Sequence, residues 1–243
     1  MVETITITGA FSYTGKYATR LLVERGYRVR TLTNHPRREN PFGDRVEAFP
    51  YNFGHPDLLR ETLRGTSTLI NTYWVRFPHG GSTFAAAVAN TKTLIAAARD
   101  AGVKRIVHVS IANPSDESPL AYYRGKAQLE KAVRDSGLSC AILRPTVIFG
   151  PEDILINNIA WFIRHFPVFG IPGDGRYGVR PIHVEDMARL IVENVEDPKN
   201  TAVDAVGPET YTFDELVRLI AGKMGRSVKL IHVPAIVAYL ATS

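Results

Sequence analysis

Short runs of apolar, mostly β-branched residues alternate along most of the chain with longer segments in which apolar residues recur at helical spacing. The short runs predict strands, and apolar positions three and four residues apart predict helices. The expected strands are residues 4–8, 27–33, 46–49, 68–72, 105–110, 138–143 and 202–206. The expected helices are residues 14–25, 57–64, 82–101, 120–136, 186–195 and 212–224, the last with a threonine cap at Thr212. Such alternation predicts βαβ units, and therefore an α/β fold with a doubly wound parallel sheet.

The pattern loosens after Gly150. Residues 166–178 contain two prolines and four glycines, which predicts a loop that lines a site. The apolar residues 154–169 carry no periodicity that fixes their structure. We therefore expect a second, smaller region after the main sheet.

The first strand runs directly into a glycine-containing turn, and a helix follows it. This strand–turn–helix order is the setting of a dinucleotide-binding fingerprint, in which the helix N-terminus faces a pyrophosphate. The run has the form G-x-x-S-x-x-G, with a serine at the middle position that can still donate a hydrogen bond to phosphate. The residues predicted to hold the cofactor here are Gly9, Ala10, Phe11, Ser12, Tyr13, Thr14 and Gly15.

The residues after the second strand indicate which dinucleotide is bound. NAD-specific sites place a carboxylate at that strand end to hold the ribose, whereas a basic residue accommodates the 2′-phosphate of NADP(H). Here the strand continues into Asn34, His35, Pro36, Arg37 and Arg38, and the first acidic residue is Glu39. Arg37 or Arg38 offers a planar fork to phosphate, and Asn34 can bond the ribose. The sequence favours NADP(H) over NAD(H).

Composition narrows the function classes further. The 243 residues carry a net charge of +5, but basic residues are interleaved with acidic ones, which argues against nucleic-acid binding. Cys140 is the only cysteine, and it excludes an internal disulfide and a cysteine-rich metal site. The sequence shows no secretory leader and no apolar stretch of bilayer length, so a cytoplasmic protein without a membrane span is expected. No pattern specifies an oligomeric state.

Several motifs in order resemble the short-chain dehydrogenase/reductase superfamily, in its extended and atypical branches related to NAD-dependent epimerase/dehydratases. They are the turn at 9–15, NTY at 71–73, YYRGK at 122–126, LRPTVIFG at 143–150 and PIHVEDMA at 181–188. The resemblance covers about residues 3–235. The turn also resembles the subgroup that contains the accessory subunit of respiratory complex I, which holds NADPH without known turnover.

The resemblance implies a Rossmann domain at 1–150, rejoined by residues 179–206. It implies a substrate-side lobe formed by 151–178 and 207–243. Members of this branch run longer than this chain, so residues 236–240 are expected to be a helix cut short in an incomplete lobe. It also implies further cofactor contacts from Asn52 and Phe53 at the adenine, Thr72 and Tyr73 along the cofactor, Pro145 and Val147 at the nicotinamide amide, and Lys126 at the ribose.

Tyr122 and Lys126 lie four residues apart and therefore on one face of the expected helix. By the resemblance, Tyr122 is a general acid or base whose pKa the Lys126 ammonium lowers. Tyr123, three residues from Lys126, is a rival to Tyr122. The family supplies a hydroxyl just past the fifth expected strand to polarise the substrate carbonyl. Ser110 is the candidate for that role, although it comes one or two residues before the usual position. Asn113, Ser115 and Ser118 remain alternatives to it.

Two function classes follow. The first is an NADP(H)-dependent oxidoreductase, epimerase or reductase that acts on a small-molecule carbonyl or alcohol. The second is a non-catalytic protein that uses bound NADPH for stability, assembly or redox sensing. His183 and Asp186 read more readily as a helix N-terminus than as a catalytic or metal pair, and no metal site is expected.

Overall fold

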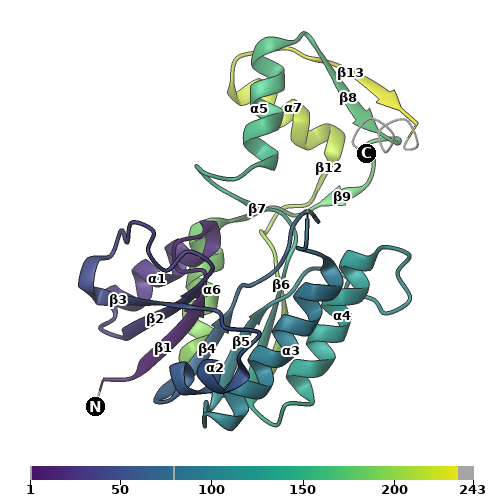
Figure 1. Cartoon of the computed structure of the whole chain (residues 1–243). Helices are drawn as coiled ribbons and strands as arrows, with labels where there is room; N and C mark the ends of the chain where they lie inside the picture. The colour runs from purple at the N-terminus through teal and green to yellow at the C-terminus, as the bar shows by residue number, and fades with distance from the viewer. Residues whose placement is uncertain (1, 79, 235–243) are drawn as a thin grey trace. The chain divides into compact units, whose positions relative to one another are not determined.

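The computed structural model describes residues 2–78 and 80–234. In the described chain, contacts divide the molecule into two compact units, Met1–Pro145 with Val184–Ala205 and Thr146–His183 with Val206–Ser243. Figure 1 shows the elements of both.

The first unit is built on a seven-stranded sheet whose paired strands are all parallel. Its strand order is β11-β6-β5-β4-β1-β2-β3. The strands are β1 (Thr4–Thr8), β2 (Arg28–Thr33), β3 (Val46–Pro50), β4 (Thr66–Asn71), β5 (Arg105–Val109), β6 (Ser139–Pro145) and β11 (Thr201–Ala205). The order reverses between β1 and β4, so the two halves of the sheet wind outward from this point. This is the doubly wound Rossmann-type fold that the alternation predicted.

Helices cover both faces of this sheet (Figure 1). One layer is α1 (Tyr13–Glu24) with α6 (Val184–Glu196), and the other is α2 (Pro56–Leu63), α3 (Phe84–Asp100) and α4 (Ala121–Arg134). A short 3₁₀ turn, Gly43–Arg45, precedes β3. Strand residues Ile5, Ile7, Ile106 and Ile142 are fully buried, as expected for a sheet covered on both sides.

The edge strand β11 reaches the sheet late in the chain. It pairs with β6 in register, Thr201 opposite Ala141. Its approach is fixed by Asn200, whose side chain accepts a hydrogen bond from the Cys140 amide at 2.8 Å. The nearly buried Arg105 guanidinium donates to the Asn194 and Lys199 carbonyls at 2.7 and 2.9 Å. These bonds hold both ends of the segment that returns to the sheet.

The second unit contains two helices and three two-stranded ladders among its described residues. The helices are α5 (Leu155–His165) and α7 (Phe213–Lys223). The ladders are β7 (Ile148–Phe149) with β10 (Ile182–His183), β8 (Val168–Pro172) with β13 (Lys229–Val233), and β9 (Gly178–Val179) with β12 (Tyr211–Thr212). Its small core is Ile159, Ile163, Ile171, Val217 and Ala221.

Two expectations for this region have different outcomes. The loop predicted at 166–178 is wrong in part, because β8 lies within it and pairs in parallel with β13. The threonine cap is confirmed: the Thr212 hydroxyl accepts from the Glu215 amide at 3.2 Å, and the Glu215 carboxylate accepts from the Thr212 amide at 2.7 Å. The helix expected at 236–240 lies outside the described residues. No helix of the described residues is long and apolar enough to cross a membrane.

Candidate dinucleotide site

The turn between β1 and α1 is tightly closed by its own backbone. Gly9 has φ of +72°, a left-handed conformation that favours glycine. A Cβ on Gly15 would lie 2.0 Å from the Gly9 carbonyl oxygen, so only glycine permits this approach of helix to strand. The first turn of α1 carries no acidic residue, so its N-terminal partial positive charge is not cancelled there. The turn is suited to an anion such as a pyrophosphate.

Ser12 behaves differently from the expectation for a phosphate donor. Its hydroxyl donates to the Gly9 carbonyl at 2.6 Å, and the Ser12 amide donates to the same oxygen at 2.9 Å. The serine therefore uses its single proton inside the turn and stabilises the turn's conformation. The Ala10 amide is held by the Thr31 hydroxyl of β2 at 2.9 Å, which ties the turn to the neighbouring strand.

A cavity of about 260 Å³ opens beside this turn. Within the first unit, its lining combines the turn with the ends of β2, β3 and β4. The residues are Gly9, Phe11, Ser12, Thr33, Asn34, His35, Arg38, Tyr51, Thr72, Tyr73 and Trp74. The carboxyl ends of the strands at a switch in strand order are where doubly wound folds bind ligands.

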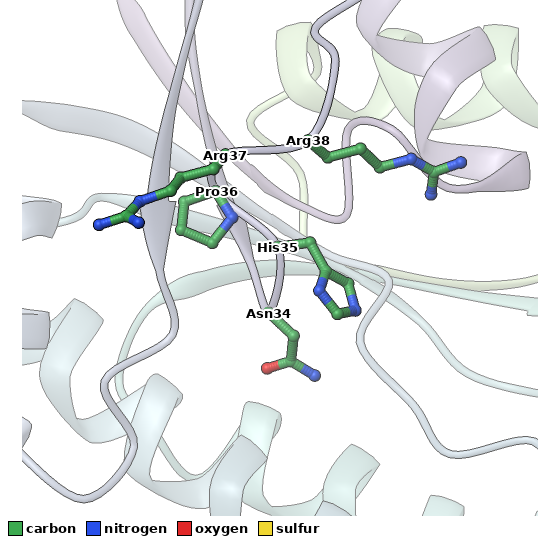
Figure 2. A pocket seen from close by; sticks show the side chains of 5 residues that line it. All are labelled: Asn34, His35, Pro36, Arg37 and Arg38. Atoms are coloured by element: carbon green, nitrogen blue, oxygen red, sulfur yellow. The ribbon is translucent and has the colours of Figure 1, made fainter.

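A second cavity, of about 640 Å³, is lined by Asn34, His35, Pro36, Arg37 and Arg38. Figure 2 shows that the Arg37 and Arg38 side chains extend from the loop in opposite directions. Arg38 lines both cavities, whereas Arg37 lines only this one. Of the two arginines named by the sequence, Arg38 is thus the one that joins the wall of the phosphate-turn cavity.

Thr72 and Tyr73 lie in that wall because the buried Thr8 hydroxyl accepts hydrogen bonds from both of their amides, at 2.6 and 2.9 Å. The Asn90 side chain donates to the Tyr73 hydroxyl at 3.0 Å and orients the ring. Phe53 stacks on Tyr51, with ring centroids 4.8 Å apart, and Tyr51 rather than Phe53 lines the cavity.

Asn52 has φ of +50°, a left-handed turn conformation next to that aromatic pair. The Pro145 carbonyl accepts from the Ala112 amide at 2.9 Å. In the second unit, the Val147 carbonyl accepts from the Ile182 amide at 2.8 Å. The carbonyls of Pro145 and Val147 thus already have protein partners.

The Tyr122–Lys126 pair lies on α4 as expected, and Trp74 contacts both side chains. The Lys126 ammonium is 4.6 Å from the Trp74 ring centroid and donates to the Val109 carbonyl at 3.0 Å. Tyr122 meets Trp74 edge to face with centroids 5.4 Å apart. Tyr123 packs on Tyr122 at 5.7 Å.

Burial controls the pKa values in this cluster. Lys126 is 3% exposed, and desolvation lowers its pKa to about 7. Burial raises the pKa of Tyr122, the reverse of the predicted lowering by Lys126. The reason is that the phenol is packed among aromatic rings, which cannot solvate a phenolate.

Ser110 and its surroundings include groups that the sequence did not single out. Ser110 is 4% exposed, and its amide donates to the Leu143 carbonyl at 2.7 Å. Burial raises the pKa of Glu130, but hydrogen bonds from Arg144 and Arg134 to its carboxylate outweigh it and leave that pKa lowered. The buried His108 ring lies 3.0 Å from the Asn71 amide, and burial, then Lys126, lowers its pKa to about 3. His108 is therefore neutral near pH 7.

His183 packs edge to face on Phe149 at 5.2 Å, directly before α6, and Asp186 pairs with Arg189 within α6. These contacts agree with the predicted helix N-terminus. Within the described residues, no group of three or more His, Cys, Asp and Glu side chains is placed to hold a metal.

Comparison with protein families matches residues 1–241 to the NmrA-like family. The chain belongs to this family. It is 25% identical over 226 residues to an Arabidopsis thaliana protein named NADH dehydrogenase [ubiquinone] 1 alpha subcomplex subunit 9, covering 88% of this chain and 56% of that one. It is 28% identical over 236 residues to a ceramide reductase from Caulobacter vibrioides, covering 95% of this chain and 73% of that one. The chain thus spans about half to two thirds of the complex I relatives.

Among solved structures, the UDP-glucuronic acid 4-epimerase of Bacillus cereus in complex with NAD matches with a TM-score of 0.80. The match covers 96% of this chain and 87% of the epimerase at 16% identity, and it shows the shared fold. The predicted resemblance to the complex I subunit is confirmed by these relatives, and the fold expected from the resemblance to the epimerase/dehydratases is confirmed by the epimerase structure.

Proposed function

We propose that this chain binds NADP(H) in the cavity beside the phosphate turn. The observation that carries the proposal is that Gly9, Ser12 and Arg38 line one cavity, which joins an anion-binding helix start to a basic loop. The tight approach of Gly15 to Gly9 supports the fit, because it brings the helix start close to the end of β1. Arg38 would pair with the 2′-phosphate, with Arg37 and Asn34 beside it, and Thr72 and Tyr73 would line the cofactor.

We further propose that the chain is the cofactor-binding part of an oxidoreductase that reduces a carbonyl or oxidises an alcohol. The cofactor would supply or accept a hydride. Tyr122 would hold or release the proton at the substrate oxygen, with Lys126 and Ser110 nearby on α4 and after β5. The relative named ceramide reductase supports this class. The second unit would be the substrate-side lobe.

The experiment has a binding part and a turnover part. Titration followed by calorimetry is expected to give NADPH a dissociation constant at least about tenfold below that of NADH, equal to about 1.4 kcal/mol. Equal affinities, or tighter NADH, would reject the NADP(H) preference. The turnover part follows NADPH oxidation with a panel of aldehydes, ketones and enones.

A second candidate is a non-catalytic NADPH-binding protein. Its support is the burial of Lys126 and the raised pKa of Tyr122, together with relatives named as complex I subunits. Tight NADPH binding without hydride transfer to any member of the panel would favour it.

A further inference from the structure

The Trp74 indole packs against residues of α3 and α4. It follows β4, stacks on Phe84 of α3 with ring centroids 5.8 Å apart, and meets Tyr122 of α4 edge to face. A Cβ on Gly125 would lie only 2.8 Å from the far end of the indole. The indole fits at this position because residue 125 has no side chain.

The indole also covers a buried charge. The Lys126 ammonium lies 4.6 Å from the ring centroid, and its hydrogen bond goes to the Val109 carbonyl. Lys126 is 3% exposed, so its amine contacts an aromatic face and a backbone carbonyl in place of water. Cation–π attraction is strongest when the cation is desolvated in this way.

Trp74 also lines the cavity at the phosphate turn, together with Gly9, Ser12 and Thr72. Lys126 is not among the residues that line this cavity, although it contacts the indole directly. A ligand seated at the turn therefore meets Trp74 before it meets the ammonium.

We propose that Trp74 is a positioning residue whose indole separates the Lys126 ammonium from the phosphate-turn cavity, so that a dinucleotide engages Lys126 only after the indole moves. This inference rests on the proposed function, because it takes NADP(H) as the ligand of the cavity. The adenosine half needs no such movement, since Arg38 and the turn already line the cavity.

The test compares NADPH with 2′,5′-ADP, which keeps the adenosine 2′- and 5′-phosphates but lacks the nicotinamide mononucleotide half. Trp74→Leu is expected to tighten NADPH binding about tenfold, because the indole no longer has to leave the cation, and to leave 2′,5′-ADP affinity unchanged. Trp74→Phe keeps an aromatic face for Lys126 and is expected to stay close to the parent. Adding Lys126→Met to Trp74→Leu is expected to cancel the gain.

Gly125→Ala moves the indole without changing it. The new methyl group would lie 2.8 Å from the far end of the ring and 3.1 Å from a Val88 methyl group. Alanine favours the helix, so α4 is expected to stay folded. This variant is expected to tighten NADPH binding in the same direction as Trp74→Leu, again without an effect on 2′,5′-ADP.

Fluorescence gives a readout that does not depend on turnover. The chain has two tryptophans, and the second one, Trp161, is 48% exposed on α5 of the second unit. In a Trp161→Phe background, all tryptophan emission comes from Trp74. NADP⁺ is expected to increase quenching of its emission by acrylamide, whereas 2′,5′-ADP is expected to leave it unchanged.

The outcomes separate the two proposals. If both ligands bind, but Trp74→Leu and Gly125→Ala shift them equally or weaken NADPH, the separating role of Trp74 is overturned while cofactor binding stands. Quenching that is the same with both ligands would also overturn it. If the parent binds neither ligand, the proposed function fails and the inference fails with it.

Discussion

The phosphate turn and the cluster around Lys126 belong to the same unit, yet they hold their polar groups in opposite ways. At the turn, Arg37 and Arg38 are exposed, and the helix start opens beside a cavity. In the cluster, Lys126 and Ser110 are buried, and Trp74 covers the ammonium. A charged ligand can reach the first region without rearrangement, whereas in the second region burial disfavours the charged form of Lys126 and lowers its pKa to about 7. The proposed cofactor binding and the proposed chemistry are therefore expected to respond to different substitutions.

The largest effect is expected at the turn itself. Gly15→Ala places a methyl group against the Gly9 carbonyl, which is backbone and cannot swing aside. We expect NADPH affinity to fall by more than about 100-fold, or about 2.7 kcal/mol, measured by calorimetry. Gly54→Ala is the matched control, because a Cβ there meets nothing within 4 Å. Retained binding in Gly15→Ala would show that the anion is held elsewhere.

The next effect belongs to the buried cluster. Tyr122→Phe is expected to reduce turnover on an accepted substrate by about 100-fold, within the usual range for a general acid or base, with NADPH affinity unchanged. Steady-state kinetics and titration of the same preparations measure the two quantities. Tyr123→Phe serves as the control and is expected to be mild; the opposite ranking would assign the proton transfer to Tyr123.

A smaller effect is expected in the basic loop. Because Arg38 lines both cavities and Arg37 only one, Arg38→Ala is expected to weaken NADPH binding about tenfold and to leave NADH unchanged. Arg37→Ala is expected to weaken NADPH less. A larger loss with Arg37→Ala, measured by the same titration, would reverse the assignment of the 2′-phosphate.

The smallest effect concerns stability and pH. Lys126 has a pKa of about 7 in the fold, against an ordinary value of 10.5, so between these values the unfolded chain binds more protons. Stability is then expected to rise with pH in this window, by about 1 kcal/mol from about pH 7 to about pH 8. Urea unfolding of the parent and of Lys126→Met measures the difference. Parallel pH profiles for the two proteins would contradict the depressed pKa.

The comparison also explains what the sequence can and cannot predict. Strand β1 has the predicted bounds, and the Thr212 cap is where the motif placed it, because both depend on residues adjacent in the chain. Strand β8 was missed because its partner β13 lies some 60 residues further on and its own residues include glycine and proline. Local periodicity carries no signal for such a pairing.

The candidate site shows the same contrast between features set by adjacent residues and features set by distant ones. The turn residues share one continuous motif, so their grouping is visible in the sequence. Trp74, in the loop after β4, contacts Lys126 of α4 and stacks on Phe84 of α3, and Gly125 leaves the space for its ring. Residues this far apart in the chain carry no shared motif. Which arginine enters the cavity depends on side-chain direction from the loop, which two adjacent identical residues do not reveal (Figure 2).

The late return of β11 has a consequence for how the chain is made. Strand β6 is complete at Pro145, but its outer partner begins at Thr201, after the whole segment from Thr146 to His183 and all of α6. During synthesis, one edge of the sheet therefore stays unpaired until those residues have emerged from the ribosome. An open edge is a template for wrong pairing. Asn200 and the Asn194 and Lys199 carbonyls that accept from Arg105 become available only when that wait ends, so the last strand closes the nascent sheet and the first unit can finish folding only then.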